Sequence, residues 1–291
     1  MYELIQVTDT SYYVQSPAKI GLYRASQDEV YLIDSGNNRD AGKRAKRILD
    51  ANGWTLKAIL NTHSHADHVG GNQYLQSQTG CRIYAPDIER VFAEHPVLGP
   101  AFLYGGFPYP ELRHKFLMAE SSEVLPLEDS CLPEGMERIP LPGHTWDMTG
   151  FRTGDGIVFL ADCLSSEATL EKYGISFLID VQTYLDTLQK VRDMEATLFI
   201  PSHADPTENI APLARLNMDK VYEIADTILG ICREPADFGT VLQKLFERYQ
   251  LNMTFEQHAL VGSTVRSYLA WLNVQGRLQV EIDRNRLVWR A

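Results

Sequence analysis

The chain has 291 residues, enough for one large domain or for a main domain with a smaller one beside it. Its net charge of −11, from 27 Lys and Arg against 38 Asp and Glu, argues against a general nucleic-acid or membrane-surface binder, because attraction to phosphate needs a basic surface. The four cysteines are scattered and form no CxxC pair, so a disulfide scaffold is not expected. The sequence shows no basic leader before an apolar core and no run near ~18 apolar residues, and we therefore predict a cytoplasmic protein.

The first third of the chain alternates predicted strands with predicted helices. Strands rich in β-branched, aromatic and other apolar residues are expected over residues 12–14, 19–24, 29–33, 56–60 and 82–86. Amphipathic or apolar helical patterns are expected over residues 39–52 and 69–79. This order is typical of a layered α/β architecture.

A dense group of metal-compatible side chains follows the strand over residues 56–60. Its members are His63, His65, Asp67 and His68. Imidazole and carboxylate are the ligands that zinc and similar cations take in hydrolytic sites. In an extended segment, side chains two residues apart share a side, so we expect His63, His65 and Asp67 to converge and His68 to serve a second ion. A His-rich surface loop is the weaker alternative, because four candidate ligands follow one strand end.

Residues 93–118 lack a regular period, because prolines and glycines interrupt them, yet they carry several large aromatic side chains. Long irregular loops in compact domains are usually functional or disordered. We therefore expect a lid or wall over the metal-compatible residues, and packing on the chain's own core or on a partner subunit is the alternative. His95 and His114 are isolated in this stretch, and we do not assign them as ligands.

Metal-compatible side chains recur where later strands end. They are His144, Asp162 and His203. The strand-like runs before them lie within residues 137–142, 151–161 and 197–201, with a helix expected over residues 180–193. Because ligands of open α/β sheets bind at the carboxyl ends of strands, four such segments predict one shared site. Cys163 beside Asp162 is a further candidate ligand, although a buried thiol is its more ordinary role.

The C-terminal part differs in pattern, so we divide the chain into a catalytic domain over residues 1–214 and a second domain over 215–291. Three amphipathic helices and a terminal hairpin predict a small winged-helix-like domain. Nucleic-acid readout would need a basic face, but from Arg215 onward ten Lys and Arg stand against nine Asp and Glu. A structural role, in packing, dimerisation or shaping the pocket, is favoured.

These motifs, in this order, resemble the metallo-β-lactamase superfamily over roughly residues 10–205. The matching segments are residues 34–36, 62–68, 143–145, 162 and 201–203. The resemblance implies an αββα sandwich of two mixed sheets, here followed by a small helical domain that ends in a β-hairpin.

The resemblance also implies a binuclear site. His63, His65 and His144 would hold one divalent ion, Asp67, His68 and His203 the other, and Asp162 would bridge them. This grouping replaces the one from strand alternation, because the chain must turn before Asp67. The ions would be zinc, with iron or manganese as alternatives, and Asp34 would steady the His-rich loop.

A bridging aspartate is similar to glyoxalase II and lactonases, whereas true β-lactamases of this fold have another residue type there. The resemblance therefore implies a hydrolase that uses a bridging hydroxide on a small ester, thioester or lactone, with Asp67 also accepting a proton. The tail lacks an obvious basic cluster for glutathione carboxylates, which weakens glyoxalase II itself.

Lactamase-like endoribonucleases have a similar tail, so a nuclease or phosphodiesterase is the alternative. An iron-dependent redox enzyme is a third reading, weakened by the lack of a flavin module. We expect a small-molecule substrate and no membrane partner, with nucleic acid as the weaker alternative and a homodimer as an option.

Overall fold

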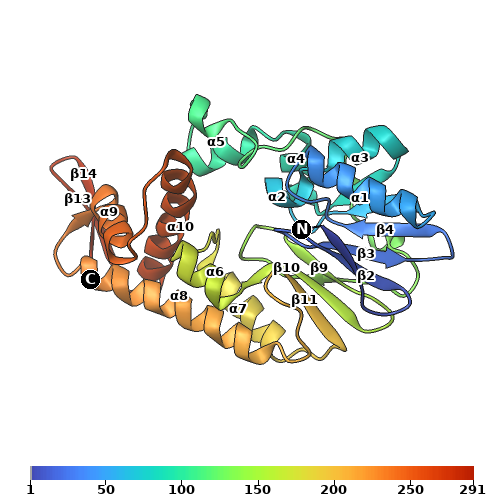
Figure 1. Cartoon of the computed structure of the whole chain (residues 1–291). Coiled ribbons are helices and arrows are strands. Elements are labelled where there is room, and N and C mark those ends of the chain that lie inside the picture. The colour runs from blue at the N-terminus through green and yellow to red at the C-terminus, as the bar shows by residue number, and fades with distance from the viewer. Residues whose placement is uncertain (1) are drawn as a thin grey trace.

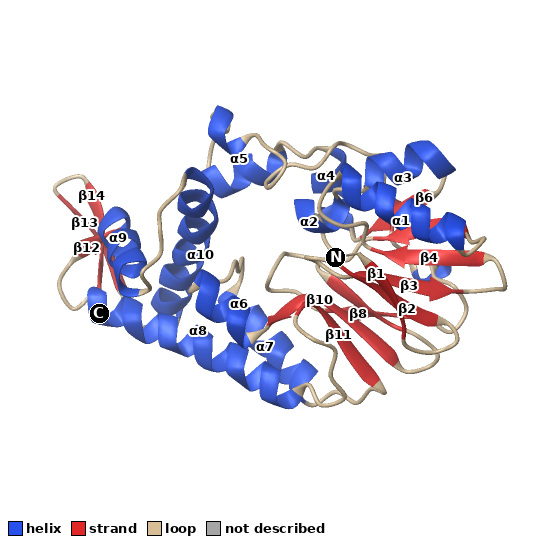
Figure 2. Cartoon of the chain, in the orientation of Figure 1, coloured by secondary structure: helices blue, strands red, loops and turns tan. Residues whose placement is uncertain are grey.

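The computed structural model describes residues 2–291 and shows two sheets packed face to face with helices outside them (Figures 1 and 2). The first sheet has its seven strands in chain order: β1 (Glu3–Gln6), β2 (Ser11–Gln15), β3 (Ile20–Arg24), β4 (Glu29–Ile33), β5 (Thr55–Leu60), β6 (Arg82–Ala85) and β7 (Leu125–Pro126). The second has the order β11 (Leu198–His203), β10 (Ile157–Ser165), β9 (Thr149–Arg152) and β8 (Glu137–Pro140). The predicted α/β sandwich is confirmed.

Helices cover the outer face of each sheet (Figure 1). Beside the first sheet lie α1 (Arg39–Ala51), α2 (Ala66–Val69), α3 (Asn72–Thr79) and α4 (Asp87–Glu94). Beside the second lie α6 (Glu167–Tyr173), α7 (Val181–Arg192) and α8 (Ala211–Ile231). The amphipathic pattern of α1 predicts a buried face of Ala41, Ala45, Ile48 and Leu49; all but Ile48, which is half-buried, are buried. Between the sheets, Leu60, Phe151 and Ile200 belong to one buried cluster.

The parallel strands explain why polar residues gather at one edge. β4 pairs in parallel with β5, and β10 pairs in parallel with β11. Such neighbours end on the same side of their sheet, and their buried runs leave only the residues after the strands free for polar chemistry. The segments after β4, β5, β10 and β11 therefore meet at one end of the sandwich.

The helix predicted over residues 69–79 is in fact two helices. α2 begins at Ala66, and the chain breaks at Gly70 and Gly71 before α3. Both glycines press against the β4–α1 connection: a Cβ on Gly71 would lie 2.3 Å from the Ser35 carbonyl oxygen. The helix breaks here because two backbone segments lie too close for a side chain, and the spacing of apolar residues in the sequence gives no sign of this contact.

The prediction of an irregular loop over residues 93–118 was partly wrong. A helix, α5 (Leu98–Tyr104), and a 3₁₀ turn, η1 (Pro110–Leu112), lie within it. Pro100 does not prevent α5, because it stands in the first turn, where the backbone N–H has no acceptor within the helix. The helix α6 was not predicted either, although Ser166 caps it by accepting from the Thr169 N–H.

The C-terminal elements follow the order predicted for them. After α8 come β12 (Ala236–Asp237), α9 (Phe238–Arg248), α10 (Phe255–Val274), β13 (Gln279–Asp283) and β14 (Arg286–Arg290). β14 lies between β12 and β13 in a small antiparallel sheet. The boundary placed between residues 214 and 215 falls inside α8, and buried side chains of α8, α9 and α10 join the cluster that covers β10. The division into two domains stays a prediction.

Within residues 2–291, no helix has both the length and the apolar character needed to cross a bilayer.

Asp155, in the turn between β9 and β10, joins the two sheets. Its carboxylate accepts hydrogen bonds from the hydroxyls of Thr10 (2.7 Å) and Ser11 (2.9 Å), and also from those of Thr8 and Thr153. Partial burial acts to raise the pKa of Asp155, but these hydroxyl donors outweigh it and hold the pKa below its ordinary value. The ionised carboxylate therefore stabilises the fold.

We expect Asp155→Asn to lower the free energy of unfolding by about 1–2 kcal/mol at neutral pH, because an amide cannot accept all these bonds and solvent screens part of the loss. Since the folded-state pKa is lowered, this contribution is present above the ordinary pKa of 3.8 and is lost as the pH falls through the folded value. Urea unfolding of both proteins should show the difference at neutral pH and a smaller one below pH 3.8. Equal stability at neutral pH would contradict the role given to Asp155.

Candidate metal centre

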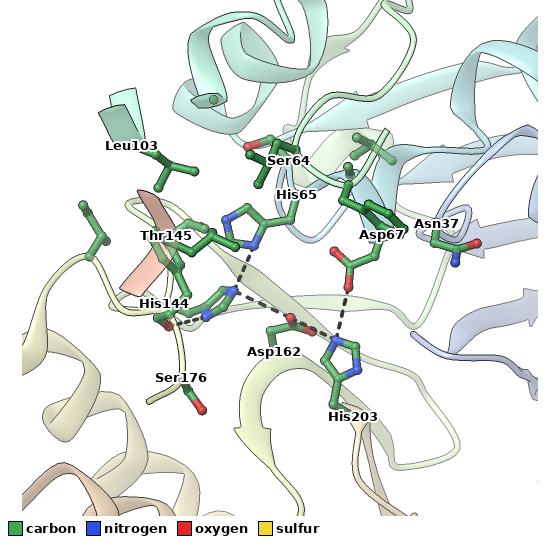
Figure 3. A pocket seen from close by; sticks show the side chains of 18 of the residues that line it. Asn37, Ser64, His65, Asp67, Leu103, His144, Thr145, Asp162, Ser176 and His203 are labelled. Atoms are coloured by element: carbon green, nitrogen blue, oxygen red, sulfur yellow. Dashed lines mark hydrogen bonds and ion pairs between the residues drawn. The ribbon is translucent and has the colours of Figure 1, made fainter. Parts of the chain in front are cut away.

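All seven predicted ligands lie together at one end of the sandwich. Figure 3 labels five of them: His65, Asp67, His144, Asp162 and His203. One group holds His63, His65, His144 and Asp162, and the other holds Asp67, His68, Asp162 and His203. Within each group, the candidate ligand atoms lie within 4.8 Å of one another. Asp162 belongs to both groups, as the family resemblance implies.

The grouping inferred from strand alternation was wrong for Asp67. Because α2 begins at Ala66, the chain turns into a helix before Asp67. Asp67 and His68 then face the second group together, while His63 and His65 stay in the first. A helical turn, in place of an extended strand, separates the two sets.

The distances show how closely Asp162 approaches both groups. Its Oδ1 lies 3.0 Å from His68 Nε2, and its Oδ2 lies 3.2 Å from His203 Nε2 and 3.6 Å from His144 Nε2. Yet His63 Nε2, His68 Nε2 and Asp162 Oδ1 are buried without a hydrogen-bond partner among the residues that the structure describes. An unsatisfied buried polar atom costs about 1–3 kcal/mol, and bound cations at these positions would satisfy all three. The donor set therefore fits a binuclear divalent site.

The two groups differ in electrostatics. Burial lowers the pKa of His63 and lowers that of His144 to about 4, so these imidazoles are neutral and can offer lone pairs. In the other group, the Asp162 carboxylate raises the pKa of His203 to about 10. Burial opposes ionisation of Asp67, but the charge of His68 overcomes it and holds the Asp67 pKa at about 2. Cations that bind here would displace protons from His203 and His68.

Asp34 fixes the orientation of the His-rich loop. Its Oδ2 accepts from His68 Nδ1 (2.7 Å) and from the Thr62 hydroxyl (2.7 Å), and its Oδ1 accepts from the Thr62 N–H (2.8 Å). Asp34 has φ of 64°, a left-handed conformation that aspartate tolerates better than most residues. The His68 Nε2 atom is thereby left to face Asp162, as expected for a residue that steadies a ligand.

A distortion of β10 presents Asp162. The pairing with β11 shifts register on both sides of Ala161, which has φ of 50°. An alanine in this region costs of order 1–3 kcal/mol, and such strain clusters at functional sites. Cys163, the next residue, is buried and belongs to neither ligand group, and burial raises its pKa to about 12.

Glu89, on α4, was missed from the sequence. It is only 2% exposed, and one carboxylate oxygen accepts from both the N–H (2.9 Å) and the hydroxyl (2.6 Å) of Ser64. The other oxygen accepts from the Asp147 N–H at 3.4 Å. Glu89 therefore joins the loop of His63 and His65 to the loop that follows His144. A single glutamate on an amphipathic helix gives no signal in the sequence that could have revealed this.

Five of the seven candidate ligands line a cavity of about 760 Å³, and they are His65, Asp67, His144, Asp162 and His203. Its walls come from α4, α5, the loop after His144, the α6–α7 connection and α10. The segment over residues 93–118 thus forms a wall of the site, through Phe102, Leu103 and Phe116 among others. His95 and His114 lie outside both ligand groups.

Comparison with known proteins agrees with this geometry. The family model described as metallo-beta-lactamase superfamily matches residues 15–203. A hydroxyacylglutathione hydrolase of Vibrio campbellii is 28% identical over 66% of this chain and 64% of its own length. Another, of Thiobacillus denitrificans, is 32% identical over 40% of this chain, and the match spans only 36% of that relative.

Two solved structures have the same fold over nearly the whole chain. A beta-lactamase domain protein from Burkholderia ambifaria is 17% identical, with a TM-score of 0.73 over 99% of this chain and 93% of its own. A metallo-beta-lactamase family protein from Thermus thermophilus is 16% identical, with a TM-score of 0.73 over 100% and 98%. Because the two matches cover 99% and 100% of this chain, they include its C-terminal helices and the small sheet.

Proposed function

This chain belongs to the metallo-β-lactamase superfamily, as a hydrolase with a binuclear His/Asp metal site, and we propose from that premise that its substrate is a small ester, thioester or lactone. The observation that carries the proposal is the position of Asp162, which belongs to both ligand groups and lines the cavity. The similarity to proteins named hydroxyacylglutathione hydrolase favours a thioester among the three.

Each group has a defined part in this proposal. His63, His65 and His144 hold one divalent ion, and Asp67, His68 and His203 hold the second, with zinc as the first choice of metal. When bound, the pair supplies an activated water and a Lewis acid. Asp67, whose side chain is partly exposed to the cavity, would be the residue to accept a proton from a water bound there.

The surroundings of the site support acyl over phosphodiester chemistry. α10 lies against α5 and η1, and it lines the cavity with Gln257, Leu260 and Val261. A winged-helix-like reader of nucleic acid would instead present a basic helix to solvent. Here residues of both α5 and α10 line the cavity, which suits a small molecule better than a polynucleotide.

A substrate panel tests the proposal. Metal-loaded protein is assayed with thioesters, lactones, simple esters, β-lactams, phosphodiesters and single-stranded RNA, before and after chelation and after zinc is restored. We expect hydrolysis of one or more of the acyl substrates, loss on chelation and recovery with metal. Efficient cleavage of RNA or phosphodiesters without any acyl hydrolysis would overturn it in favour of the nuclease alternative.

A further inference from the structure

The cavity has an apolar wall on one side of the metal-compatible floor. Leu103 from α5 and Leu260 and Val261 from α10 contribute to it. Figure 3 places Leu103 on the side of His65 and His144, whereas Asn37 lies on the side of Asp67. The space beside His65 and His144 is therefore bounded partly by these apolar side chains, with the hydroxyls of Thr145 and Ser176 also nearby.

Aromatic rings extend this wall toward the mouth of the cavity. The ring of Phe102 lies 6.2 Å from that of Phe92 and 6.1 Å from that of Trp146, centre to centre, in edge-to-face arrangements. All three residues line the cavity, and Phe102 and Trp146 are 41% and 48% exposed. Large rings left open to a cavity are typical of a pocket for an apolar ligand group.

α10 is held firmly to the ligand loops. Thr264 Oγ1 on α10 accepts from the Leu178 N–H (3.1 Å), and Ser267 Oγ donates to the Ile179 carbonyl (2.9 Å). One residue before Leu178, the Phe177 carbonyl accepts from His144 Nδ1 (2.9 Å). The Phe177 ring also packs 5.1 Å from that of His65. The wall on α10 and the first ligand group therefore form one connected unit.

We propose that α10 and α5 form the acyl-binding wall of the site and that the acyl group of the substrate is apolar, either an aromatic ring or a medium-length aliphatic chain. This inference depends on the proposed function, because it assumes acyl hydrolysis at the metal centre. Leu103, Leu260 and Val261 give no hydrogen-bond partner to a hydroxyl on the acyl group. The acyl preference expected from this wall differs from the hydroxyacyl group that the name of the relatives specifies.

A series of thioesters on one common thiol, N-acetylcysteamine, tests this preference. Acetyl, lactoyl, butanoyl, hexanoyl and benzoyl thioesters are compared by kcat/KM. We expect a rise of about fourfold per added methylene from acetyl to hexanoyl, with benzoyl high and lactoyl near acetyl. Equal values across the series, or a preference for lactoyl, would overturn the apolar wall while leaving acyl hydrolysis standing. No hydrolysis of any acyl substrate in the wider panel would overturn both.

Variants of Leu260 assign the preference to α10. Leu260→Ser is expected to lower the hexanoyl-to-acetyl ratio of kcat/KM about tenfold, because it removes carbon from the wall. Leu260→Trp, which fills the space, should lower the same ratio by excluding the longer chain. Val274→Ser, at an 83% exposed position near the end of the same helix, is the matched control and should leave the ratio unchanged. If both Leu260 variants fold, shown by unchanged circular dichroism, and keep the wild-type ratio, the assignment is wrong.

Discussion

Replacing Asp162 with alanine is expected to lower kcat/KM for acyl substrates about a thousandfold or more. Asp162 is the one residue of the seven ligands that both groups share, and it lies within 3.6 Å of three imidazole nitrogens. Losing it removes an anionic ligand from each ion, and Lewis-acid stabilisation of the transition state amounts to several kcal/mol. Because each 1.36 kcal/mol changes the rate tenfold, a loss of about 4 kcal/mol gives this factor.

The neighbouring residue provides a matched control. Cys163→Ala changes the next side chain on β10, which is buried but belongs to neither ligand group. It should keep kcat/KM within a few-fold of wild type, at a modest cost in stability from the small cavity. Asp162→Ala with near wild-type kcat/KM, or Cys163→Ala with the same large loss, would contradict the role given to Asp162.

Asp34→Asn is expected to weaken metal binding by roughly 10–100-fold, mainly at the group that contains His68. An asparagine tolerates the left-handed backbone at this position, so the fold should survive. Its amide, however, replaces a carboxylate that accepts from His68 Nδ1 and twice from Thr62. Activity measured against added zinc, after chelation, should require a higher metal concentration than in wild type.

Asp155→Asn is the control for Asp34→Asn, because it also replaces a carboxylate with an amide but does so far from the metal-compatible residues. It should reduce stability but leave the zinc dependence of activity unchanged, since the Asp155 carboxylate accepts from hydroxyls of the β1–β2 turn, the start of β2 and the β9–β10 turn. A zinc requirement for Asp34→Asn equal to that of wild type would contradict the positioning role of Asp34.

The sequence indicated the candidate ligands because they lie near strand ends: after β5 and β8, within the later part of β10, and at the last residue of β11. Apolar runs mark β5, β10 and β11 clearly, and the residues after parallel strands must meet at one edge. The assignment of Asp67 from strand alternation failed, however, because nothing in the local pattern shows that α2 begins at Ala66. The family resemblance placed Asp67 in the second ligand group instead. The helical turn that begins at Ala66 explains this placement, because it turns Asp67 away from His63 and His65.

Contacts between distant segments were harder to predict. Glu89 acts through Ser64 and Asp147, which are distant from it in sequence. The break at Gly71 depends on the close approach of Ser35. The contribution of α10 to the cavity depends on how the C-terminal helices dock, and residue patterns along one helix say only which face is apolar.

The docking of α10 gives the C-terminal helices a role at the site. The sequence favoured packing or shaping of the pocket over nucleic-acid readout because the tail is nearly neutral. In the structure, α10 contributes Leu260 and Val261 to the cavity and holds the loop that orients His144. Removing residues 215–291 would therefore open the cavity and loosen a ligand.

Metal analysis of the purified protein tests the central claim most directly. The two ligand groups predict about two divalent ions per wild-type chain, measured by inductively coupled plasma mass spectrometry, and a clear loss of bound metal in Asp162→Ala. Chains that carry no divalent ion after incubation with zinc, yet hydrolyse acyl substrates at full rate, would contradict the binuclear site.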